Sequence, residues 1–437
     1  MYRKIIEEVK DKKIVILGFG KEGKSTYNFI KKYLPDKKIT IMDSNYENIS
    51  EAVDIDYDKL NDFDIIMKSP GISLKDYDFI DKDKIYSQVE YFLKYKNCLT
   101  IGVTGTKGKS TTTSLIYKIL QEQKDKVYLA GNIGIPIFEY IDLLDNDSTV
   151  IIELSSHQLE YINYSPNIAL ILNLYEEHLD HYKNVDCYYQ SKLNIAKFQE
   201  SSDYLLYTTD NEMLDDYIKK TYIKSKKINI TYDKKLNSNV YIDDYCVYNG
   251  NVLYNINDTR KLKGKHNLKN IMFALEVASI LNLNLEKVRN SINNFEPLPH
   301  RMELVGTYDG VTYYNDSIAT IPNSTINSIE TFKNINTLII GGKDRGIDYN
   351  DFIKYLNKSN IENIICLPDT GHNISKFINK KIYLVNDLKE AVIISKKITK
   401  KNNICLLSPA AASYGFFKNF EERGNLFKEY VRNEEIK

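Results

Sequence analysis

The chain has little of what would mark it for an oxidising compartment, a membrane or a polyanionic partner. Its five cysteines are scattered without a CxxC pair, which argues against zinc and a disulfide framework and fits a reducing cytosol. No apolar run reaches the roughly 20 residues that a membrane helix needs. The 59 basic and 59 acidic side chains leave no net charge, so neither nucleic acid nor an anionic membrane is expected as a partner. The N-terminal sequence MYRKIIEEVKDKKIVILG is charged and passes directly into a strand pattern, unlike a signal peptide, so we expect a cytoplasmic protein.

What the sequence does contain is a regular alternation of strand-like and helix-like segments. The chain of 437 residues is longer than a single hydrophobic core ordinarily supports, so we expect more than one domain. Its composition, 43% hydrophobic and 27% charged residues, is typical of a globular protein. The alternation predicts an α/β fold in which helices cover parallel sheets. We expect three domains: a Rossmann-like domain at 1–96, a central P-loop ATPase-like domain with a parallel sheet at 97–297, and a C-terminal Rossmann-like domain at 298–437. The segment EPLPHRME contains two prolines and marks the last boundary.

The central part carries a phosphate-loop motif. TGTKGKST at 104–111 follows the apolar run CLTIGVTG and opens the helical stretch STTTSLIYKILQEQ. Glycines let backbone N–H groups face phosphate oxygens, and the helix N-terminus adds positive potential. Lys109 would reach the β- and γ-phosphates and Ser110 would ligate Mg²⁺, although Val103 stands where the strict pattern has glycine. The expected ATP-binding residues of this loop are Gly105, Thr106, Lys107, Gly108, Lys109, Ser110 and Thr111, and the alternative is a glycine-rich turn with a surface lysine.

Two further polar residues fall on the same edge of the predicted central sheet. Glu153 lies at the end of the strand VIIELSS, and His178, in NLYEEHLDHY, follows the next strand. The carboxyl ends of parallel strands meet beside such a loop, and Mg²⁺ favours carboxylate oxygens. We therefore weigh metal binding by Glu153 and His178 against two alternatives, a solvated glutamate and a structural histidine.

The N-terminal part carries a second glycine motif. Gly18 to Gly23 reads GFGKEG, which matches GxGxxG between a strand and a helix, and Asp43 ends the next strand. This is the dinucleotide fingerprint, but its backbone amides and its carboxylate suit any nucleoside diphosphate. An NAD-dependent dehydrogenase would not need the second phosphate loop at 104–111, so we disfavour NAD. A tight turn without a ligand is the remaining alternative.

Taken together, these motifs resemble those of the Mur ligase family over essentially the whole chain. The resemblance is carried, in chain order, by TGTKGKST, ELSSHQLE, NLYEEHLDHY, YYQSKLNI, GKHNLKN, LPHRME and NDSIAT. It implies an ATP-dependent ligase that forms an amide bond through an acyl-phosphate. The segment LLSPAAASYGFFKNFEERGNLF, the chain length and the GxGxxG first domain are most similar to the D-glutamate-adding branch. That branch implies UDP-N-acetylmuramoyl-L-alanine, D-glutamate and ATP as substrates, and we expect a monomer.

The resemblance also implies roles for individual residues. The catalytic residues would be Lys109, Glu153, His178 and Lys192, and the ligands of two Mg²⁺ ions would be Ser110, Glu153, His178 and a carbamate on Lys192. From the residues alone, Lys192 would be an ordinary surface lysine. Beyond the loop, ATP would contact Asn267, Asn270, Arg301 and Asp316. The UDP substrate would contact Gly18, Phe19, Gly20, Lys21, Gly23, Asp43, Ser44, Ser69, Pro70, Gly71 and Asn132. D-Glutamate would contact Thr320, Arg345, Ser413, Tyr414 and Phe420.

The sequence departs from the family pattern at two places. The family's NDSKATN reads NDSIATI here, so Ile318 replaces a lysine, and Arg345 replaces the lysine of GGxxKG while keeping its charge. The SSH at 155–157 is similar to the diamino-acid-adding ligase, but no DNPR-like motif of that ligase is present. A folylpolyglutamate synthase would begin directly with its ATP loop. A nucleotide-sensing module without chemistry would not need Lys109, Glu153, His178 and Lys192 together.

Overall fold

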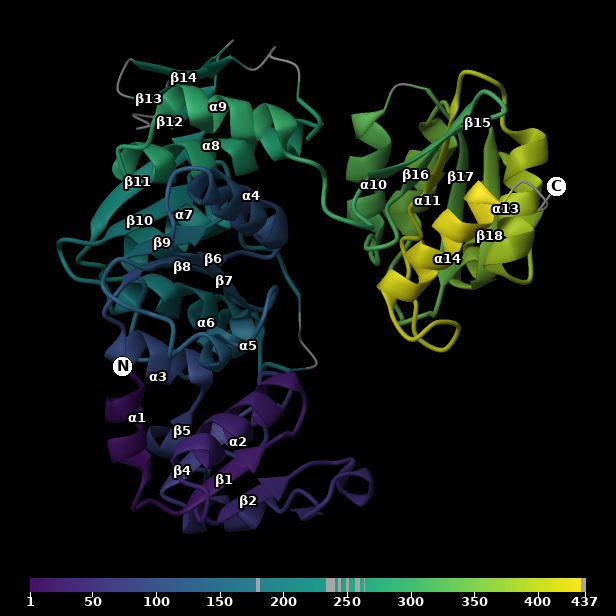
Figure 1. Cartoon of the computed structure of the whole chain (residues 1–437). Coiled ribbons are helices and arrows are strands. Elements are labelled where there is room, and N and C mark those ends of the chain that lie inside the picture. The colour runs from purple at the N-terminus through teal and green to yellow at the C-terminus, as the bar shows by residue number, and fades with distance from the viewer. Residues whose placement is uncertain are drawn as a thin grey trace. The chain divides into compact units, whose positions relative to one another are not determined.

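The computed structural model divides the chain into two compact units. It describes all residues except 178–180, 233–239, 243–244, 249–250, 256–259, 263, 333 and 434–437. The first unit comprises Met1–Arg260 and Asn267–Phe295, and the second comprises Lys261–His266 and Glu296–Lys437. Within the described residues, the first unit contains a five-stranded and a nine-stranded sheet and the second a six-stranded sheet (Figure 1).

The N-terminal sheet has the order β3-β2-β1-β4-β5, and its paired strands are parallel. Its strands are β1 (Ile14–Leu17), β2 (Ile39–Met42), β3 (Ala52–Val53), β4 (Ile65–Lys68) and β5 (Ile85–Tyr86). The helices are α1 (Tyr2–Val9), α2 (Lys21–Tyr33) and α3 (Gln88–Tyr95), with short 3₁₀ turns η1 (Tyr46–Asn48), η2 (Tyr57–Asp62) and η3 (Lys82–Lys84). The strands β1 and β4 are buried along their whole length; the apolar run of β1 predicts this, whereas β4 ends in the buried Lys68.

The central sheet has the order β14-β13-β12-β11-β10-β9-β6-β8-β7. Its strands are β6 (Leu99–Thr104), β7 (Val127–Gly131), β8 (Thr149–Glu153), β9 (Ile168–Ile171), β10 (Tyr204–Thr208), β11 (Lys226–Thr231), β12 (Val240–Ile242), β13 (Tyr245–Tyr248) and β14 (Asn251–Asn255). Its helices are α4 (Lys109–Gln121), α5 (Ser156–Leu159), α6 (Val185–Lys197), α7 (Glu212–Lys220), α8 (Lys265–Ile280) and α9 (Leu285–Asn294), with η4 (Ile137–Glu139). The strands β6 to β12 pair in parallel, whereas β12, β13 and β14 form an antiparallel extension. The helix α4 packs on one face against β7 and β8, and α6 packs against β6 and β9 (Figure 1).

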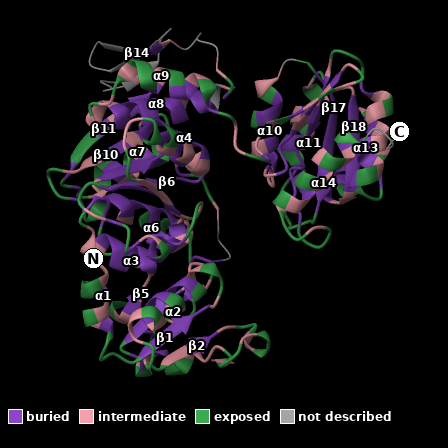
Figure 2. Ribbon diagram, viewed as in Figure 1, coloured by how far each residue is buried: buried purple, intermediate pink, exposed green. Residues whose placement is uncertain are grey.

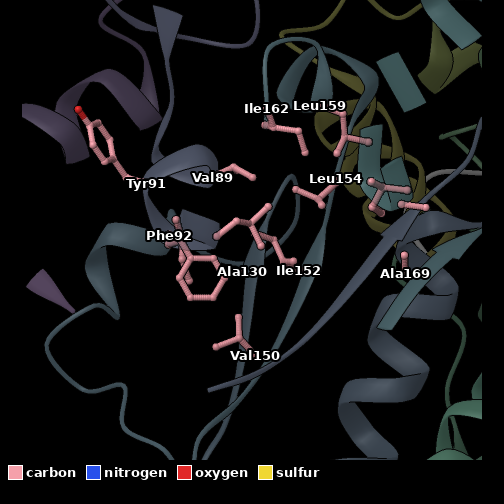
Figure 3. Close-up of a cluster of buried hydrophobic side chains, with 14 of the residues drawn as sticks. Val89, Tyr91, Phe92, Ala130, Val150, Ile152, Leu154, Leu159, Ile162 and Ala169 are labelled. Atoms are coloured by element: carbon pink, nitrogen blue, oxygen red, sulfur yellow. The ribbon is translucent and has the colours of Figure 1, made fainter. Parts of the chain in front are cut away.

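The first two sheets share one hydrophobic core, which explains why they fall into a single unit. The helix α3 connects them, and its residues Val89 and Phe92 lie beside Ala130 and Ile152 of the central sheet (Figure 3). The same cluster continues to Ile16 of β1 in the N-terminal sheet. Because burying apolar surface is the main favourable contribution to folding, this continuous core fixes the N-terminal sheet against the central one.

The second unit is built around the order β15-β16-β20-β17-β18-β19. Its strands are β15 (Glu303–Tyr308), β16 (Val311–Asn315), β17 (Ile335–Gly342), β18 (Asn363–Asp369), β19 (Lys381–Leu384) and β20 (Ile404–Leu407). Its helices are α10 (Pro322–Thr331), α11 (Asn350–Lys358), α12 (Thr370–Ser375), α13 (Leu388–Ile398) and α14 (Phe420–Arg432). The hairpin β15–β16 is antiparallel, and the other pairs are parallel. Figure 2 shows the interior strands buried beneath helices on both sides.

The expected fold class is confirmed, because mostly parallel sheets covered by helices run through both units. The strands expected before each glycine motif are β1 and β6, and the expected break at EPLPHRME falls where the second unit resumes at Glu296. No helix in the described part of the chain is both long and apolar enough to cross a membrane.

Candidate active site

The phosphate loop lies between the end of β6 at Thr104 and the start of α4 at Lys109. Gly105 and Gly108 have φ values of 149° and 87°, which residues other than glycine rarely adopt. A Cβ on Gly108 would come within 2.7 Å of Oδ1 of Asn270. Both glycines are therefore needed for the turn, and the loop delivers Ser110 and Thr111 to the first turn of α4.

A residue that the sequence did not single out holds this loop in shape. The Oδ1 atom of Asn173, after β9, accepts the N–H groups of Thr106 and Lys107 at 3.0 and 2.8 Å. The Nδ2 atom of Asn173 donates to the Lys107 carbonyl at 3.0 Å, and its own carbonyl accepts Thr106 N–H at 3.1 Å. The amides of Thr106 and Lys107 therefore bind Asn173, which leaves the start of α4 as the anion-facing part of the loop.

Two lysines converge on the carbonyl of Gly105. Lys109 Nζ donates to Gly105 O at 2.9 Å and to Thr106 O at 3.0 Å, and Lys192 Nζ donates to Gly105 O at 3.0 Å. Lys192 lies on α6 and is only 2% exposed, so the alternative of a surface lysine is wrong. Burial, followed by the nearby charge of Lys109, holds the pKa of Lys192 well below its ordinary value, against the opposing charges of Glu177 and Glu153. The structure thus favours a neutral amine at Lys192.

Glu153 ends β8 beside the phosphate loop, as the sequence predicted. It is fully buried, and it lies across from Val103 of β6 in the parallel pairing. Its Oε1 atom accepts Asn132 Nδ2 at 2.7 Å, whereas its Oε2 atom has no hydrogen-bond partner among the described residues. A buried carboxylate oxygen without a donor is costly unless a cation or a ligand completes it, so the donor set at Glu153 fits Mg²⁺. His178 lies outside the described residues.

Two buried asparagines stand next to the phosphate loop. Asn267 and Asn270 lie near the start of α8, and Asn270 Nδ2 donates to Asn267 Oδ1 at 2.9 Å. The close approach of Asn270 to Gly108 brings this pair to the loop. The structure therefore brings both asparagines to the loop at which the sequence predicts a nucleotide.

The N-terminal glycine turn is also built as the motif predicts. Gly18 has a φ of 89°, and a Cβ on Gly23 would come within 2.1 Å of the Gly18 carbonyl, so only glycine allows α2 to pack this closely. Ser69 Oγ donates to Gly18 O at 2.7 Å, which joins the turn to the segment Ser69–Gly71 after β4. The carboxylate of Asp43 accepts the N–H of Phe19 at 2.6 Å and that of Asn45 at 2.8 Å.

The remaining residues expected at the UDP substrate lie around this turn and across from it. Lys21 and Ser44 are exposed, Pro70 is half-buried and Gly71 is exposed. Lys21 Nζ donates to the Gly134 carbonyl at 2.8 Å and so reaches the loop after β7, close in sequence to Asn132. Asn132 itself is tied to Glu153 through both its main chain and its side chain. Residues from both sheets of the first unit thus border the N-terminal turn.

In the second unit, Asp316 follows β16 and is buried in a polar network. Its Oδ2 atom accepts the hydroxyls of Ser328 and Ser408 at 2.6 and 2.8 Å, and its Oδ1 atom accepts Met302 N–H at 3.2 Å. Burial raises the pKa of Asp316 to about 6, although these hydrogen bonds and the charge of Arg301 oppose the shift. The structure thus brings the expected pair Arg301 and Asp316 together.

Three of the five residues expected to bind D-glutamate, Thr320, Arg345 and Phe420, have contacts in the segment that carries Ile318. Arg345 Nη2 donates to the Thr320 carbonyl at 2.9 Å, which holds the guanidinium beside the segment that has isoleucine in place of lysine. Ser413 is buried, Tyr414 is exposed and Phe420 is half-buried at the start of α14. The Phe420 carbonyl accepts Ser317 Oγ at 2.8 Å. These contacts place all five expected residues in the same unit.

A second residue that the sequence did not single out is Arg423, on α14. Its side chain is fully buried and donates to Ser317 Oγ at 3.0 Å, Ser317 O at 2.8 Å and Ala411 O at 3.1 Å. Burial lowers its pKa to about 10, which still leaves the guanidinium charged at neutral pH. Arg423 thus places a positive charge beside Ser317, the residue before Ile318. Its position in the quoted segment NFEERG was visible in the sequence, but its burial was not.

Two family models match the chain: Mur ligase middle domain over residues 103–278 and Mur ligase, glutamate ligase domain over residues 300–411. The chain is 34% identical over 459 residues to UDP-N-acetylmuramoylalanine--D-glutamate ligase of Clostridioides difficile, covering 98% of this chain and 99% of that protein. The chain belongs to the Mur ligase family. A protein of the same name from Christiangramia forsetii is also 34% identical, over 97% of this chain and 99% of that protein.

Solved Mur ligases share the fold at lower identity. The MurF ligase of Thermotoga maritima, in complex with ADP, has a TM-score of 0.60 at 16% identity and covers 97% of this chain and 96% of that chain. The UDP-N-acetylmuramate-alanine ligase MurC of the same organism has a TM-score of 0.60 at 19% identity and covers 96% of this chain and 98% of that chain. The Mur ligase architecture therefore extends over nearly the whole chain.

Proposed function

We propose that this Mur ligase joins D-glutamate to UDP-N-acetylmuramoyl-L-alanine at the expense of ATP, as a step of peptidoglycan precursor synthesis. The observation that carries the proposal is 34% identity, over almost the full length of both chains, to proteins named for this reaction. The substrate carboxylate would attack the γ-phosphate to give an acyl-phosphate and ADP. The amine of D-glutamate would then attack the acyl carbon and release phosphate.

The residues of the phosphate loop provide fixed positive potential for the first step. The transferring phosphoryl group is anionic, so its reaction with a carboxylate is limited by charge crowding and positioning. We assign Lys109 to the transferred phosphate, Ser110 and the start of α4 to the phosphate chain, and Asn267 and Asn270 to the adenine nucleotide. In the second unit, Arg301 and Asp316 would contact phosphate and ribose.

Mg²⁺ fits the oxygen donors next to this loop, and when bound it would neutralise charge on the phosphate oxygens. We assign one ion to Ser110 and Glu153, supported by the buried Oε2 atom of Glu153, which has no hydrogen-bond partner among the residues that the structure describes. A second ion is assigned to His178 and a carbamate on Lys192. Asn132, which holds the other oxygen of Glu153, would fix the direction of that carboxylate.

The carbamate on Lys192 is supported by its burial and its lowered pKa. Carbamoylation needs a neutral amine, and an ammonium at this depth would repel a cation. Lys192→Ala should lose most activity and regain part of it with added formate or acetate, which supply the missing oxygens. Lys192→Arg should stay inactive in both conditions, with circular dichroism as the folding control. Near-normal ligation by Lys192→Arg would exclude the carbamate.

We assign the two remaining substrates to the two ends of the chain. The turn at 18–23, with Asp43, Ser44 and the segment Ser69–Gly71, would hold the uridine diphosphate. Thr320, Arg345, Ser413, Tyr414 and Phe420 would hold D-glutamate, with Arg345 providing the charge that Ile318 lacks. We accordingly propose three functional domains: 1–96 for the UDP substrate, 97–297 for ATP and 298–437 for the amino acid. We further propose that the protein acts in the cytoplasm as a monomer.

Phosphate release in the presence of ATP and Mg²⁺ tests the proposed function. Release should require UDP-N-acetylmuramoyl-L-alanine and D-glutamate together, and L-glutamate or a diamino acid should not replace D-glutamate. Faster release with a diamino acid than with D-glutamate would instead support the diamino-acid-adding alternative.

A further inference from the structure

A buried row of charged side chains lies where the two sheets of the first unit meet. Lys68 is the last residue of β4, directly before Ser69–Gly71, and its side chain is only 3% exposed. Its Nζ atom lies 3.7 Å from Oε2 of Glu160, at the end of α5. The same carboxylate oxygen lies 3.1 Å from Nε2 of His181. The row therefore joins the end of an N-terminal strand to two segments of the central part.

A second carboxylate approaches Lys68 from the glycine turn. Glu22 lies in the first turn of α2, and its Oε1 atom accepts Gln158 Nε2 at 2.6 Å. Burial raises the pKa of Glu22, while the hydrogen bond from Gln158 and the charge of Lys68 oppose that shift. Gln158 Oε1 in turn accepts Ser155 N–H at 3.0 Å, which caps α5 just after Glu153.

The main chain of Glu22 is held as well. Gln88, at the start of α3, donates from Nε2 to the Glu22 carbonyl at 2.9 Å and to Thr26 Oγ1 at 3.0 Å. The position of Glu22 is therefore fixed by α3 and by α5 at once. Its carboxylate has little freedom to turn away from Lys68.

The charges of this row matter for an anionic ligand. The Lys68 ammonium lies 3.7 Å from the Glu160 carboxylate in a region with little solvent to screen them, and the charge of Glu160 opposes the effect of burial, which lowers the pKa of Lys68. Removing the ammonium would leave His181 Nε2, at 3.1 Å, as the remaining close partner of the Glu160 Oε2 atom, and would make the region beside the segment Ser69–Gly71 more negative. A buried charge that loses its partner is strongly unfavourable, so the segments that carry these residues would also shift apart.

We propose that Lys68 is a positioning residue for the nucleotide-sugar substrate: it pairs with Glu160, ties the segment Ser69–Gly71 to the end of α5, and offsets the carboxylate charge next to the diphosphate. This assignment rests on the proposed function, which places that substrate at these turns. Lys68 acts on the substrate through the segments it holds and through its charge. Its removal should therefore weaken binding of the nucleotide sugar without weakening binding at the ATP loop.

Calorimetry on the full chain with UDP-N-acetylmuramoyl-L-alanine and, separately, with ADP tests this. Lys68→Met should bind the nucleotide sugar about tenfold more weakly and ADP as tightly as the wild type. A tenfold change lies within the range of interaction free energies measured between residues of one salt-bridge network. Lys68→Arg should recover most of the loss because it keeps the charge. The double variant Lys68→Met/Glu160→Gln should recover part of it, since the carboxylate charge that Lys68 offsets is removed as well. The matched control is Lys59→Met, which breaks an exposed pair with Asp56 in the same N-terminal part.

Each outcome decides the assignment. Unchanged nucleotide-sugar binding by Lys68→Met would overturn it, and so would an equal loss of ADP binding, which would mean general unfolding. If the double variant bound the nucleotide sugar no better than Lys68→Met, the claim that Lys68 offsets the charge of Glu160 would be overturned. If Lys68→Met does not fold by circular dichroism, Lys68→Arg and the double variant carry the same comparison. Failure of the wild type itself to bind the nucleotide sugar would contradict the proposed function and the assignment of Lys68 with it.

Discussion

Ionisation of Glu276 should control the stability of the first unit between weakly acidic and weakly alkaline pH. Glu276 lies on α8, the helix that begins with Asn267 and Asn270, and it is fully buried. Neither of its carboxyl oxygens has a hydrogen-bond partner among the described residues. Burial raises its pKa from 4.5 to about 8. At neutral pH the folded protein therefore keeps a protonated carboxyl at this position.

The size of the effect follows from the shift. Between pH 4.5 and 8 the unfolded chain has lost this proton while the folded chain retains it, so the free energy of unfolding falls as the pH rises. The slope is about 1.4 kcal/mol per pH unit, and the shift from 4.5 to about 8 corresponds to about 5 kcal/mol over the whole range. Below pH 4.5 both states are protonated, so the free energy of unfolding is at its full value and no longer changes with pH through this group.

Glu276→Gln isolates this effect, because it keeps the shape and the polar group but cannot ionise. Urea midpoints of the wild type and the variant, followed by circular dichroism, should diverge steadily between about pH 5 and 8. The wild type and the variant both bury a polar group, so their absolute stabilities are not compared. The prediction concerns how steeply the urea midpoint of each protein changes with pH. Glu286→Gln, an exposed glutamate on α9, controls for loss of a charge. Parallel curves for the wild type and Glu276→Gln would refute the reasoning.

Four further outcomes are expected. Lys109→Ala should lower turnover by roughly 10²–10³-fold, as loss of a preorganised group at the reacting phosphoryl does, and a rate above about a tenth of wild type would exclude the assignment. Asn173→Ala should raise the KM for ATP about tenfold, because it removes the three side-chain hydrogen bonds that hold Thr106 and Lys107, and leave the nucleotide-sugar KM unchanged; steady-state kinetics with each substrate varied distinguishes this from general damage. Arg345→Ala should raise the KM for D-glutamate more than that for ATP, with the exposed Lys354→Ala as control, and equal D-glutamate KM values would place the compensating charge elsewhere. Calorimetry should show binding of UDP and none of NADH, and the reverse would overturn the interpretation of residues 18–43.

Local patterns predicted the strands, the two glycine turns and the placement of Glu153, because strand ends and left-handed glycines are written in short stretches of sequence. Contacts between distant segments were not predictable in this way. Asn173 reaches the phosphate loop only because β9 pairs with β6. The burial of Lys192, Arg423 and Glu276 likewise depends on which helix faces the sheet, and composition alone would place such charged residues on the surface.

The carboxyl group of Asp43 illustrates a second reason. The spacing of the dinucleotide motif offers this carboxylate to a ligand, and in the structure its oxygens also accept the N–H groups of Phe19 and Asn45. The motif thus encodes the shape of the turn as well as a ligand. Spacing cannot separate these two uses, because both require the same residue at the same distance from the glycines.

Transfer of oxygen-18 tests the central claim most directly. The alanyl carboxylate of UDP-N-acetylmuramoyl-L-alanine would be labelled with oxygen-18, and the products of one round of ligation with ATP and D-glutamate would be analysed by mass spectrometry. An acyl-phosphate requires that carboxylate to attack the γ-phosphate, so one labelled oxygen should appear in the released inorganic phosphate and ADP should be unlabelled. Label in AMP, or inorganic phosphate without label, would contradict the account.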